Sequence, residues 1–385
     1  MFIQRYLKCD LPQGQSCFFW GARKSGKSTY LKQQFPESFY IDLLQADTYR
    51  KYSDAPQRLR EEINSHNTYT TIIIDEVQKI PALLDEVHHM IETNKNLKFI
   101  LCGSSARRLK FTGANLLGGR AWRYVFMPFC YAELKTLDWN RIFNHGLIPN
   151  HYLASSNIGK FLSSYLLDYI LPEVQFEANL RKRDAFTRFL YVLGLSHGEM
   201  INCSNIAREC GVDSKTVRTY FEILEDMYLG YHISPYKSRS KRQIITETPK
   251  FYLFDTGIAN YLRQFEYKEM SGTLAGKAFE HYIILELIAY KNLNEKREQI
   301  FYWRTKSGYE VDAIIGNNAF EIKISSSIER SDLKGLIEFA KDNNEFKLHV
   351  ISMEKTLRIT NIENTQIIIW PVQMFLEALW KNEIW

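Results

Sequence analysis

The chain has 385 residues, a length that predicts two or three domains rather than one hydrophobic core. Its composition, 45% hydrophobic and 24% charged, is typical of a soluble globular protein, and without a run of about 18 apolar residues or a signal-peptide layout we expect a cytoplasmic protein with no membrane contact. The net charge of +5 permits an anionic partner without requiring one, and the six scattered cysteines indicate reduced thiols rather than zinc ligands or disulfides.

The first informative segment is SCFFWGARKSGKSTY at residues 16–30. We expect a buried strand over 16–20, a loop over 21–28 that fits the pattern G-x-x-x-x-G-K-[ST], and a helix from there onward. Such a loop turns backbone N–H groups toward a polyphosphate, Lys27 adds positive charge for the β and γ phosphates, and Ser28 can bind Mg²⁺. The alternative is a chance glycine turn. The residues expected to contact ATP are Gly21, Ala22, Arg23, Lys24, Ser25, Gly26, Lys27, Ser28 and Thr29.

Residues 71–76, TIIIDE, predict a second strand of the same sheet. Its β-branched run indicates burial on both faces, and its acids follow at the carboxyl end, where doubly wound sheets place ligand groups. We expect Asp75 to bind Mg²⁺, directly or through water, and Glu76 to orient or deprotonate the attacking water. The alternative is that both acids only cap the next helix.

A third strand, expected over 97–103, ends in Ser104 and Ser105, and a hydroxyl group there can contact the γ-phosphate or the attacking water. Residues 116–120, LLGGR, precede another expected strand at 123–127. Together with the phosphate loop and the Asp-Glu strand end, these segments resemble an AAA+ ATPase core.

The resemblance implies roles for three residues. Ser104 corresponds to the polar residue called sensor 1, with Ser105 as the near alternative. Arg120 corresponds to the arginine that reaches the nucleotide site of a neighbouring subunit, which implies a homo-oligomer, usually a ring of six. The alternative is that Arg120 pairs only with a local carboxylate. We identify no sensor 2 arginine.

More narrowly, the segments GSS, GGR, MPFCYAEL and PKFYLFDTGI are similar to those of prokaryotic ATPases with a C-terminal DUF4143 region. This resemblance extends over nearly the whole chain. The phosphate loop is its most specific part.

The middle of the chain predicts two helical units. Residues 155–195 carry Leu, Tyr and Phe at helical spacing and predict a lid over the nucleotide, while 201–212 and 213–224 predict a helix-turn-helix. The exposed start of the second helix suits a major groove, and the basic segment 236–242 suits the hairpin of a winged fold. The alternative is a packing or protein-binding module. The residues expected to contact DNA are Lys215, Thr216, Arg218, Lys237, Arg239, Lys241 and Arg242.

Near the C-terminus, a helix start, a hairpin and a strand carry three acids and a lysine. Glu321 and Lys323 share one face of an expected strand, since side chains alternate, and Asp312 on the neighbouring strand can reach the same place. Two carboxylates can bind Mg²⁺ or Mn²⁺, here Asp312 and Glu321. With Glu280, this set resembles the catalytic residues of the PD-(D/E)XK nuclease fold. The alternatives are a surface Glu-Lys pair beside unrelated acids, or a degenerate nuclease fold that binds without cutting.

The sequence therefore predicts an α/β protein in three parts: an AAA+ core with a doubly wound parallel sheet and helical lid at 1–195, a winged helix at 196–262, and a PD-(D/E)XK-like α/β domain at 263–385. The expected function is ATP-driven remodelling of duplex or branched DNA, which the last domain binds or cuts. The alternative is a nucleotide-gated switch whose C-terminal region binds a protein partner. The physiological substrate and the direction of movement are left open.

Overall fold

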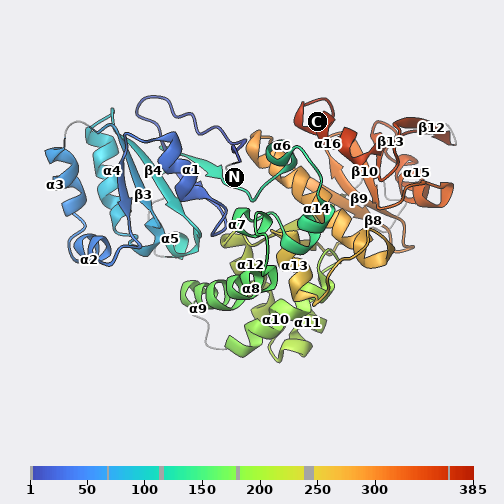
Figure 1. Cartoon of the computed structure of the whole chain (residues 1–385), viewed down its shortest axis with the longest axis horizontal. Coiled ribbons are helices and arrows are strands. Elements are labelled where there is room, and N and C mark those ends of the chain that lie inside the picture. Colours follow the sequence, from blue (N-terminus) through green and yellow to red (C-terminus); the bar gives the residue numbers. More distant parts are fainter. Residues whose placement is uncertain (1–2, 67–68, 112–116, 179–182, 238–246, 363–364) are drawn as a thin grey trace.

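The computed structural model describes residues 3–66, 69–111, 117–178, 183–237, 247–362 and 365–385. Figure 1 shows a sheet with its helices at one end of the molecule, formed by the N-terminal part of the chain, and a second sheet at the other end, formed mainly by the C-terminal part. Helices from the middle of the chain form a third lobe between them. The predicted domain boundaries at residues 195 and 262 stay predictions.

The N-terminal sheet has five described strands in the order β2-β3-β4-β1-β5, and every pairing is parallel. Its central strands are continuous apolar runs because helices cover both faces. The parallel register brings the carboxyl ends of the strands to one edge, so the segments that follow them converge there. This confirms the predicted α/β class and parallel sheet. The strands are β1 (Ser16–Trp20), β2 (Phe39–Asp42), β3 (Thr71–Asp75), β4 (Lys98–Gly103) and β5 (Ala121–Val125).

The helices of this lobe follow the strands in alternation, as expected for crossover connections between parallel strands. Several boundaries differ from the sequence prediction: α1 begins at Lys27 rather than Thr29, β4 begins at Lys98 rather than Leu97, and β5 spans Ala121–Val125 rather than residues 123–127. The helical segments are α1 (Lys27–Gln34), α2 (Ala46–Asp54), α3 (Arg58–Ser65), η1 (Val77–Lys79), α4 (Leu83–Thr93) and α5 (Arg107–Phe111).

The helical lobe includes both predicted helical units. The expected helix-turn-helix is formed by two helices that begin at side-chain caps: Asn202 accepts from Asn205 N, and Asp213 accepts from Thr216 N. Between them, Gly211 adopts a left-handed conformation that ends the first helix. The helical segments between β5 and α14 (Gly272–Leu293) are α6 (Tyr131–Leu134), which lies beside α14 (Figure 1), and η2 (Arg141–His145), α7 (Pro149–Tyr152), α8 (Ile158–Ser164), η3 (Tyr165–Ile170), α9 (Leu171–Ala178), α10 (Arg183–Ser196), α11 (Cys203–Cys210), α12 (Ser214–Asp226) and α13 (Thr256–Leu262).

The second sheet has eight described strands in the order β12-β13-β11-β10-β9-β8-β6-β7. Strands β6 and β7, which the sequence analysis assigned to the winged module, form its edge, because Ser234 and Pro235 of β6 pair with β8. The sheet thus joins the middle of the chain to its C-terminal part. The strands are β6 (Gly230–Pro235), β7 (Lys250–Leu253), β8 (Ile300–Arg304), β9 (Glu310–Ile315), β10 (Asn318–Lys323), β11 (Lys347–Ser352), β12 (Arg358–Ile362) and β13 (Thr365–Pro371). The helices are α14 (Gly272–Leu293), η4 (Arg330–Leu333), α15 (Lys334–Ala340) and α16 (Val372–Trp380).

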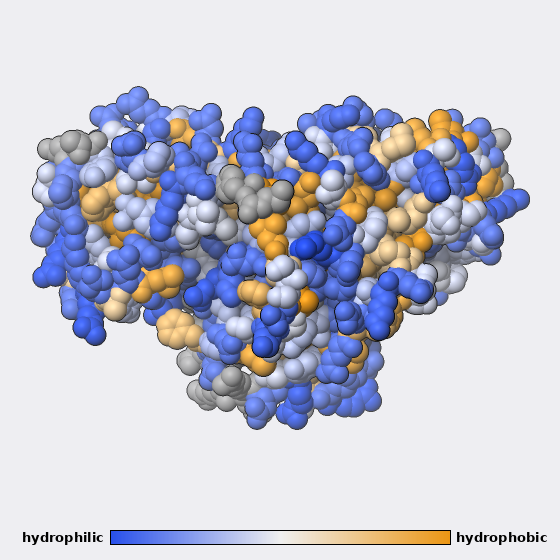
Figure 2. Space-filling model, in the orientation of Figure 1, coloured by the Kyte–Doolittle hydropathy of each residue, from blue (hydrophilic) through white to orange (hydrophobic). Residues whose placement is uncertain are grey.

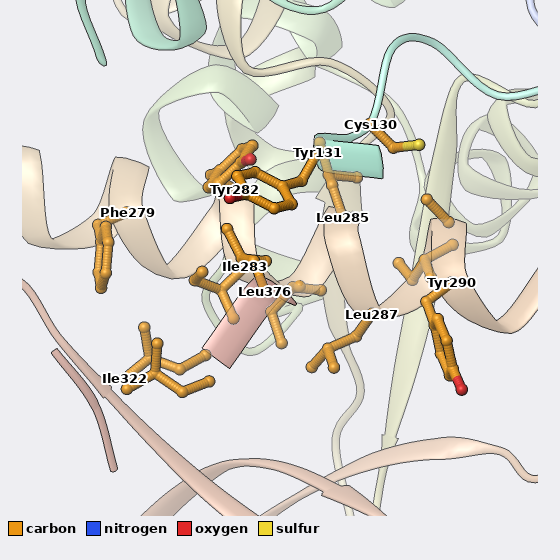
Figure 3. Packing of buried hydrophobic residues seen from close by; sticks show 14 of the residues in the cluster. Cys130, Tyr131, Phe279, Tyr282, Ile283, Leu285, Leu287, Tyr290, Ile322 and Leu376 are labelled. Atoms are coloured by element: carbon orange, nitrogen blue, oxygen red, sulfur yellow. The ribbon is translucent and has the colours of Figure 1, made fainter. Parts of the chain in front are cut away.

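Helix α14 is buried along most of its length and organises the largest core cluster. One side carries Phe279, Ile283 and Leu287 toward Ile322 and Leu376 of the C-terminal lobe (Figure 3). Another side of the helix faces the segment after β5, where Cys130 and Tyr131 lie (Figure 3). A helix that is apolar nearly all round is one packed on several sides. Helix α14 therefore packs the C-terminal sheet against the segment that leaves the N-terminal sheet.

The surface is mainly polar. Hydrophilic residues cover most of the face shown in Figure 2, and the hydrophobic residues visible there lie in smaller separate areas. Among the helices in the described ranges, none has both the length and the apolar composition needed to cross a bilayer.

Candidate functional site

The phosphate loop connects β1 to α1 through two glycines that its shape requires. Gly26 has φ of +99°, which glycine adopts without strain. At Gly21, a Cβ atom would lie only 2.2 Å from the carbonyl oxygen of Phe126. Because α1 starts directly after Gly26, the loop places its backbone N–H groups at a helix N-terminus, which favours an anion.

Lys27 is buried and folds back onto the loop. Its Nζ donates to the carbonyl oxygens of Gly21 at 2.7 Å and Ala22 at 3.0 Å. Within the described residues it forms no ion pair, so its charge is solvated only by neutral dipoles. A phosphate oxygen would be a stronger acceptor than either carbonyl.

Asp75, at the end of β3, is buried beside Ser28. Its Oδ2 accepts from Ser28 Oγ at 2.6 Å and from the hydroxyl of Tyr40 at 2.5 Å. Burial and the Asp75 carboxylate raise the pKa of Tyr40, which therefore stays a hydrogen-bond donor. The two residues expected to bind Mg²⁺ are thus adjacent, and their oxygen atoms are the ligand type that this ion prefers.

Glu76 has φ of +60°, a left-handed conformation that is uncommon for a residue other than glycine. In this conformation its Oε2 accepts from Gln78 Nε2 at 2.6 Å and from Ser104 Oγ at 3.4 Å. Gln78 also donates to Ser104 Oγ at 3.1 Å. By contrast, Ser105 Oγ accepts from the backbone N–H of Arg107. Ser104, rather than Ser105, therefore lies beside the carboxylate predicted to act on water.

A cavity of about 370 Å³ adjoins the loop and has the size of a small-molecule site. Its walls include Lys24, Lys27, Ser28 and Glu76 from the N-terminal lobe, and α7 contributes further residues. The cavity, the loop amides and the unpaired Lys27 together fit a nucleotide with its metal ion.

The helices predicted as a lid contact the phosphate loop. Arg23 pairs with Glu173 of α9 at 3.4 Å, and its guanidinium group lies 5.0 Å from the centre of the Tyr169 ring. The hydroxyl of Tyr165 donates to the carbonyl oxygen of Arg23 at 2.9 Å. Burial raises the pKa of Glu173. Residues from η3 and α9 therefore face the same end of the loop as Ser104.

Arg5 supports the loop from the other side. Its guanidinium group donates to the carbonyl oxygens of Ser25 at 2.7 Å and Met127 at 2.6 Å, and it pairs with buried Glu133 at 2.9 Å. It also lies 4.1 Å from the centre of the Phe126 ring. Arg5 lies before β1 and is not part of any recognised motif. The sequence therefore gives no signal for its contact with the phosphate loop.

Arg120 lies far from the phosphate loop of its own chain. Ala121 pairs with Ser16 at the start of β1, whereas the loop follows Trp20 at the end of that strand. At a rise of about 3.3 Å per residue, this separation is roughly 13 Å along the strand. The exposed side chain contacts Glu92 of α4, which is the local pairing that the sequence analysis gave as the alternative. The role in a neighbouring subunit stays a prediction.

The residues predicted to contact DNA are only partly described. Lys215 and Arg218 are exposed near the start of α12, and Lys237 is exposed after β6. Thr216 instead donates its hydroxyl to Asp213 at 3.0 Å as part of the helix cap. Arg239, Lys241 and Arg242 lie outside the described residues.

In the C-terminal sheet, three of the four residues predicted for a nuclease-like site meet on adjacent strands. The β9–β10 register pairs Phe320 with Ala313 and so places Glu321 opposite Asp312. Lys323 pairs with Glu321 at 2.6 Å, and Asp312 Oδ2 accepts from the backbone N–H of Ile322 at 2.7 Å. The alternation of side chains along β10 gave the correct face.

Glu280, on α14, reaches this cluster through a residue that the sequence analysis did not select. Lys250 of β7 lies 3.2 Å from Glu280 Oε1 and 2.6 Å from Glu310 Oε1. The hydroxyl of Tyr252 also donates to Glu280, at 2.5 Å. The only available signal was a lysine in an otherwise apolar strand, two residues from a tyrosine on the same face.

Burial controls the charges in this C-terminal carboxylate site. It raises the pKa of Asp312 to about 7, with the nearby charge of Glu280 adding to the effect. It also raises the pKa of Glu321 well above the usual range, and Asp312 adds to that shift. Burial works against the charge of Lys323, but Glu321 and Asp312 outweigh it and raise its pKa.

The metal ligands predicted for the C-terminal carboxylate site are two carboxylates. Within the described part of the chain, no three His, Cys, Asp or Glu side chains are grouped so that they could bind one metal ion. The predicted pair, Asp312 and Glu321, lacks a third such ligand, and Glu280 is engaged by Lys250 and Tyr252. Asp312 and Glu321 therefore stay the predicted pair of ligands for Mg²⁺ or Mn²⁺, while Glu280 is held by a lysine.

The chain is similar in part to two known proteins. An uncharacterized protein of Haemophilus influenzae is 22% identical over 271 residues, which cover 63% of this chain and 67% of that protein. A solved structure of the replication initiator DnaA bound to AMPPCP and single-stranded DNA is 12% identical, covers 55% of this chain and 82% of the DnaA chain, and has a TM-score of 0.26.

Three families match successive parts of the sequence. Residues 136–269 match a domain of unknown function, DUF8612. The other two matches confirm the resemblance found in the sequence: an AAA domain (AAA_14) at residues 13–135 and a domain of unknown function, DUF4143, at residues 275–375. The chain therefore contains an AAA domain at residues 13–135 and a C-terminal DUF4143 domain at residues 275–375.

Proposed function

We propose that the N-terminal lobe binds ATP and hydrolyses it. The observation that carries this proposal is that Lys27, Asp75 and Glu76 pair only with neutral groups within the described residues, so their charges are available to a ligand. Bound Mg²⁺ would neutralise charge on the transferred phosphoryl group. Ser28 and Asp75 are the residues that would bind it.

The other steps of ATP hydrolysis use side chains that line the same site. Lys27 exchanges its two carbonyl acceptors for phosphate oxygens. Glu76 orients the attacking water and accepts its proton, and Ser104, 3.4 Å from Glu76, fixes the position of that carboxylate. Arg23 and Glu173 link the loop to the lid, so nucleotide binding is coupled to movement of α9.

We also propose that hydrolysis is used to remodel duplex or branched DNA. The support is the pair of exposed cations, Lys215 and Arg218, at the start of a capped second helix in a helix-turn-helix. Such cations contact phosphates and make binding dependent on salt. The C-terminal domain would then bind the DNA next to α12, because β6 and β7 join the two parts.

Turnover in this scheme depends on an assembly, for which we favour a ring of six. Arg120 is exposed at the edge of the sheet opposite the phosphate loop, so it can reach a nucleotide only in another subunit. Its pairing with Glu92 is on the surface and is easily exchanged.

The deciding experiment measures ATP turnover with no DNA and with linear, forked and four-way DNA at several salt concentrations. Stimulation by DNA that weakens steeply with salt supports the proposal, and Lys215→Ala together with Arg218→Ala should reduce that stimulation. Lys334→Ala, a lysine on α15 away from the helix-turn-helix, is the matched control. If none of these DNAs changes the rate of ATP turnover, the proposed action on DNA is contradicted.

The second candidate is a nucleotide-gated switch whose C-terminal region binds a protein partner without cutting DNA. The pairing of Glu280 with Lys250 favours a C-terminal domain without cleavage activity. A nicking assay with Mg²⁺ or Mn²⁺ compares the native chain with Asp312→Ala. Cleavage lost in this variant supports a nuclease, and absence of cleavage in both supports a binding domain.

A further inference from the structure

Lys250 is the most deeply buried cation of the C-terminal carboxylate site. It is 4% exposed, and its ammonium group lies between two acids that come from different elements, Glu280 of α14 and Glu310 of β9. Arg304 of β8 also pairs with Glu310, at 2.7 Å. The site therefore holds four acids, Glu280, Glu310, Asp312 and Glu321, together with three cations from three different strands.

A buried ammonium group is costly unless carboxylates surround it. Burial alone would lower the pKa of Lys250, but Glu280, Tyr252 and Glu310 outweigh it and raise the pKa well above its usual value. For Glu310 the effect is reciprocal: burial opposes its charge, and Lys250 lowers its pKa. Lys250 is thus a permanent positive charge at this position.

We infer that Lys250 is the resident cation of the C-terminal carboxylate site, where its ammonium group takes the place between Glu280 and Glu310 that a divalent metal ion would need. The inference concerns this site only and does not depend on the proposed action on DNA. Two consequences follow. Three cations balance most of the charge of the four acids without metal, and the site is complete only when β7, from the middle of the chain, is paired at the edge of the C-terminal sheet.

The same geometry predicts what happens when the charge is removed. Lys250→Met retains much of the apolar length of the side chain, and it leaves Glu280 without its cation and Glu310 with Arg304 alone. Uncompensated carboxylates attract a divalent ion, and the loss of a competing positive charge within about 4 Å strengthens that attraction. Lysine at this position therefore excludes metal ions as well as neutralising acids.

The test measures Mn²⁺ binding to the full chain without nucleotide. The electron paramagnetic resonance signal of free Mn²⁺ reports how much of the ion is bound. All variants carry Asp75→Asn, so that the nucleotide site does not contribute. The chain that retains Lys250 should bind Mn²⁺ weakly, and neither Asp312→Asn nor Glu280→Gln should change that affinity. The Lys250→Met chain should bind Mn²⁺ at least about tenfold more tightly. Lys250→Arg should behave like lysine because it keeps the charge. The matched control is Lys347→Met, at an exposed lysine that begins β11, and it should change nothing.

Two results would overturn the inference. One is Mn²⁺ binding in the Lys250 chain that Asp312→Asn or Glu280→Gln removes, which would make the site a metal centre despite the lysine. The other is a Lys250→Met chain that melts cooperatively near the temperature of the Lys250 chain and yet gains no affinity. If Lys250→Met does not fold, the comparison of the Lys250 chain with Asp312→Asn decides by itself: equal binding supports the inference and lost binding refutes it.

Discussion

The nucleotide site and the C-terminal carboxylate site contain similar residues in opposite electrostatic states. Both lie beside strands of a sheet, and both combine buried acids with a buried lysine. In the nucleotide site, Lys27 is held by two backbone carbonyls and Asp75 by two hydroxyl groups. In the carboxylate site, Lys250 and Lys323 are each held by carboxylates.

A charged side chain that contacts only neutral groups can bind a charged ligand. A charged side chain that is already paired with an opposite charge has to break that ion pair first. A lysine on neutral carbonyls loses little when it turns to a phosphate, whereas breaking a buried ion pair leaves two uncompensated charges and costs about 3–5 kcal/mol. The motif of acids and lysine is therefore not sufficient to define a catalytic site. The partners of the charged groups decide what they can bind.

The largest effect should come from removing the available lysine. Lys27→Ala should lose ATP binding, and its turnover should fall below detection, because the loop amides alone cannot offset the charge of the β and γ phosphates. Calorimetric titration with ATP measures the binding directly. The control is Lys32→Ala, an exposed lysine on the same helix. Normal ATP affinity in Lys27→Ala would remove the basis for the comparison.

Arg120 differs from both buried lysines, because it is a cation paired with a carboxylate at the surface of the protein. Because the Glu92 pair is exposed, we expect Arg120 to leave it for a neighbouring subunit's nucleotide, and Arg120→Ala should reduce turnover by roughly 1000-fold while ATP binding is kept. Turnover per chain should rise with protein concentration only when Arg120 is present. Glu92→Gln, which frees the arginine, should not reduce turnover. Normal hydrolysis by dilute, monomeric Arg120→Ala would contradict the role in trans.

Glu76 tests whether the carboxylate beside Ser104 acts on water. Glu76→Gln keeps the hydrogen bond from Gln78 possible but cannot accept a proton, so turnover should fall roughly 100-fold with ATP affinity unchanged. Ser104→Ala should cost less, about tenfold, since it only positions Glu76. Single-turnover rates and ATP affinity separate the two effects. An equal loss in Ser105→Ala would mean that the serine was assigned incorrectly.

The smallest effect concerns the pH dependence of stability that one histidine of the C-terminal lobe, His349, contributes. Burial lowers the pKa of His349 to about 4 from 6.5, and its ring accepts from Trp370 Nε1 in the neutral form. The unfolded chain therefore binds a proton first as the pH falls, and stability should decrease between about pH 6.5 and 4, by about 3 kcal/mol at most. At pH 7 no change is expected. Urea unfolding across this range should show a weaker pH dependence in His349→Gln, and an unchanged slope would exclude this residue as the cause.

The sequence predicted the positions of the phosphate loop and of the Asp75-Glu76 strand end because both are local features of the chain. The phosphate loop needs only its own glycines and the start of α1, and Asp75 and Glu76 follow a strand whose burial is visible in its β-branched run. Its supporting contacts were not predictable. Arg5, Tyr40 and Glu173 come from segments without a motif, and the fold alone brings them to the loop.

For the C-terminal site, the sequence determined that Asp312, Glu321 and Lys323 share one face, because the alternation of side chains and a short hairpin are local properties of the chain. Only the tertiary structure decided that β7 brings Lys250 against Glu280 and Glu310, and that Arg120 points away from its own nucleotide site. The physical reason is that a charge is neutralised only by groups that lie close to it in space. Strand pairing between distant segments of the chain, such as β6 with β8, determines which groups these are.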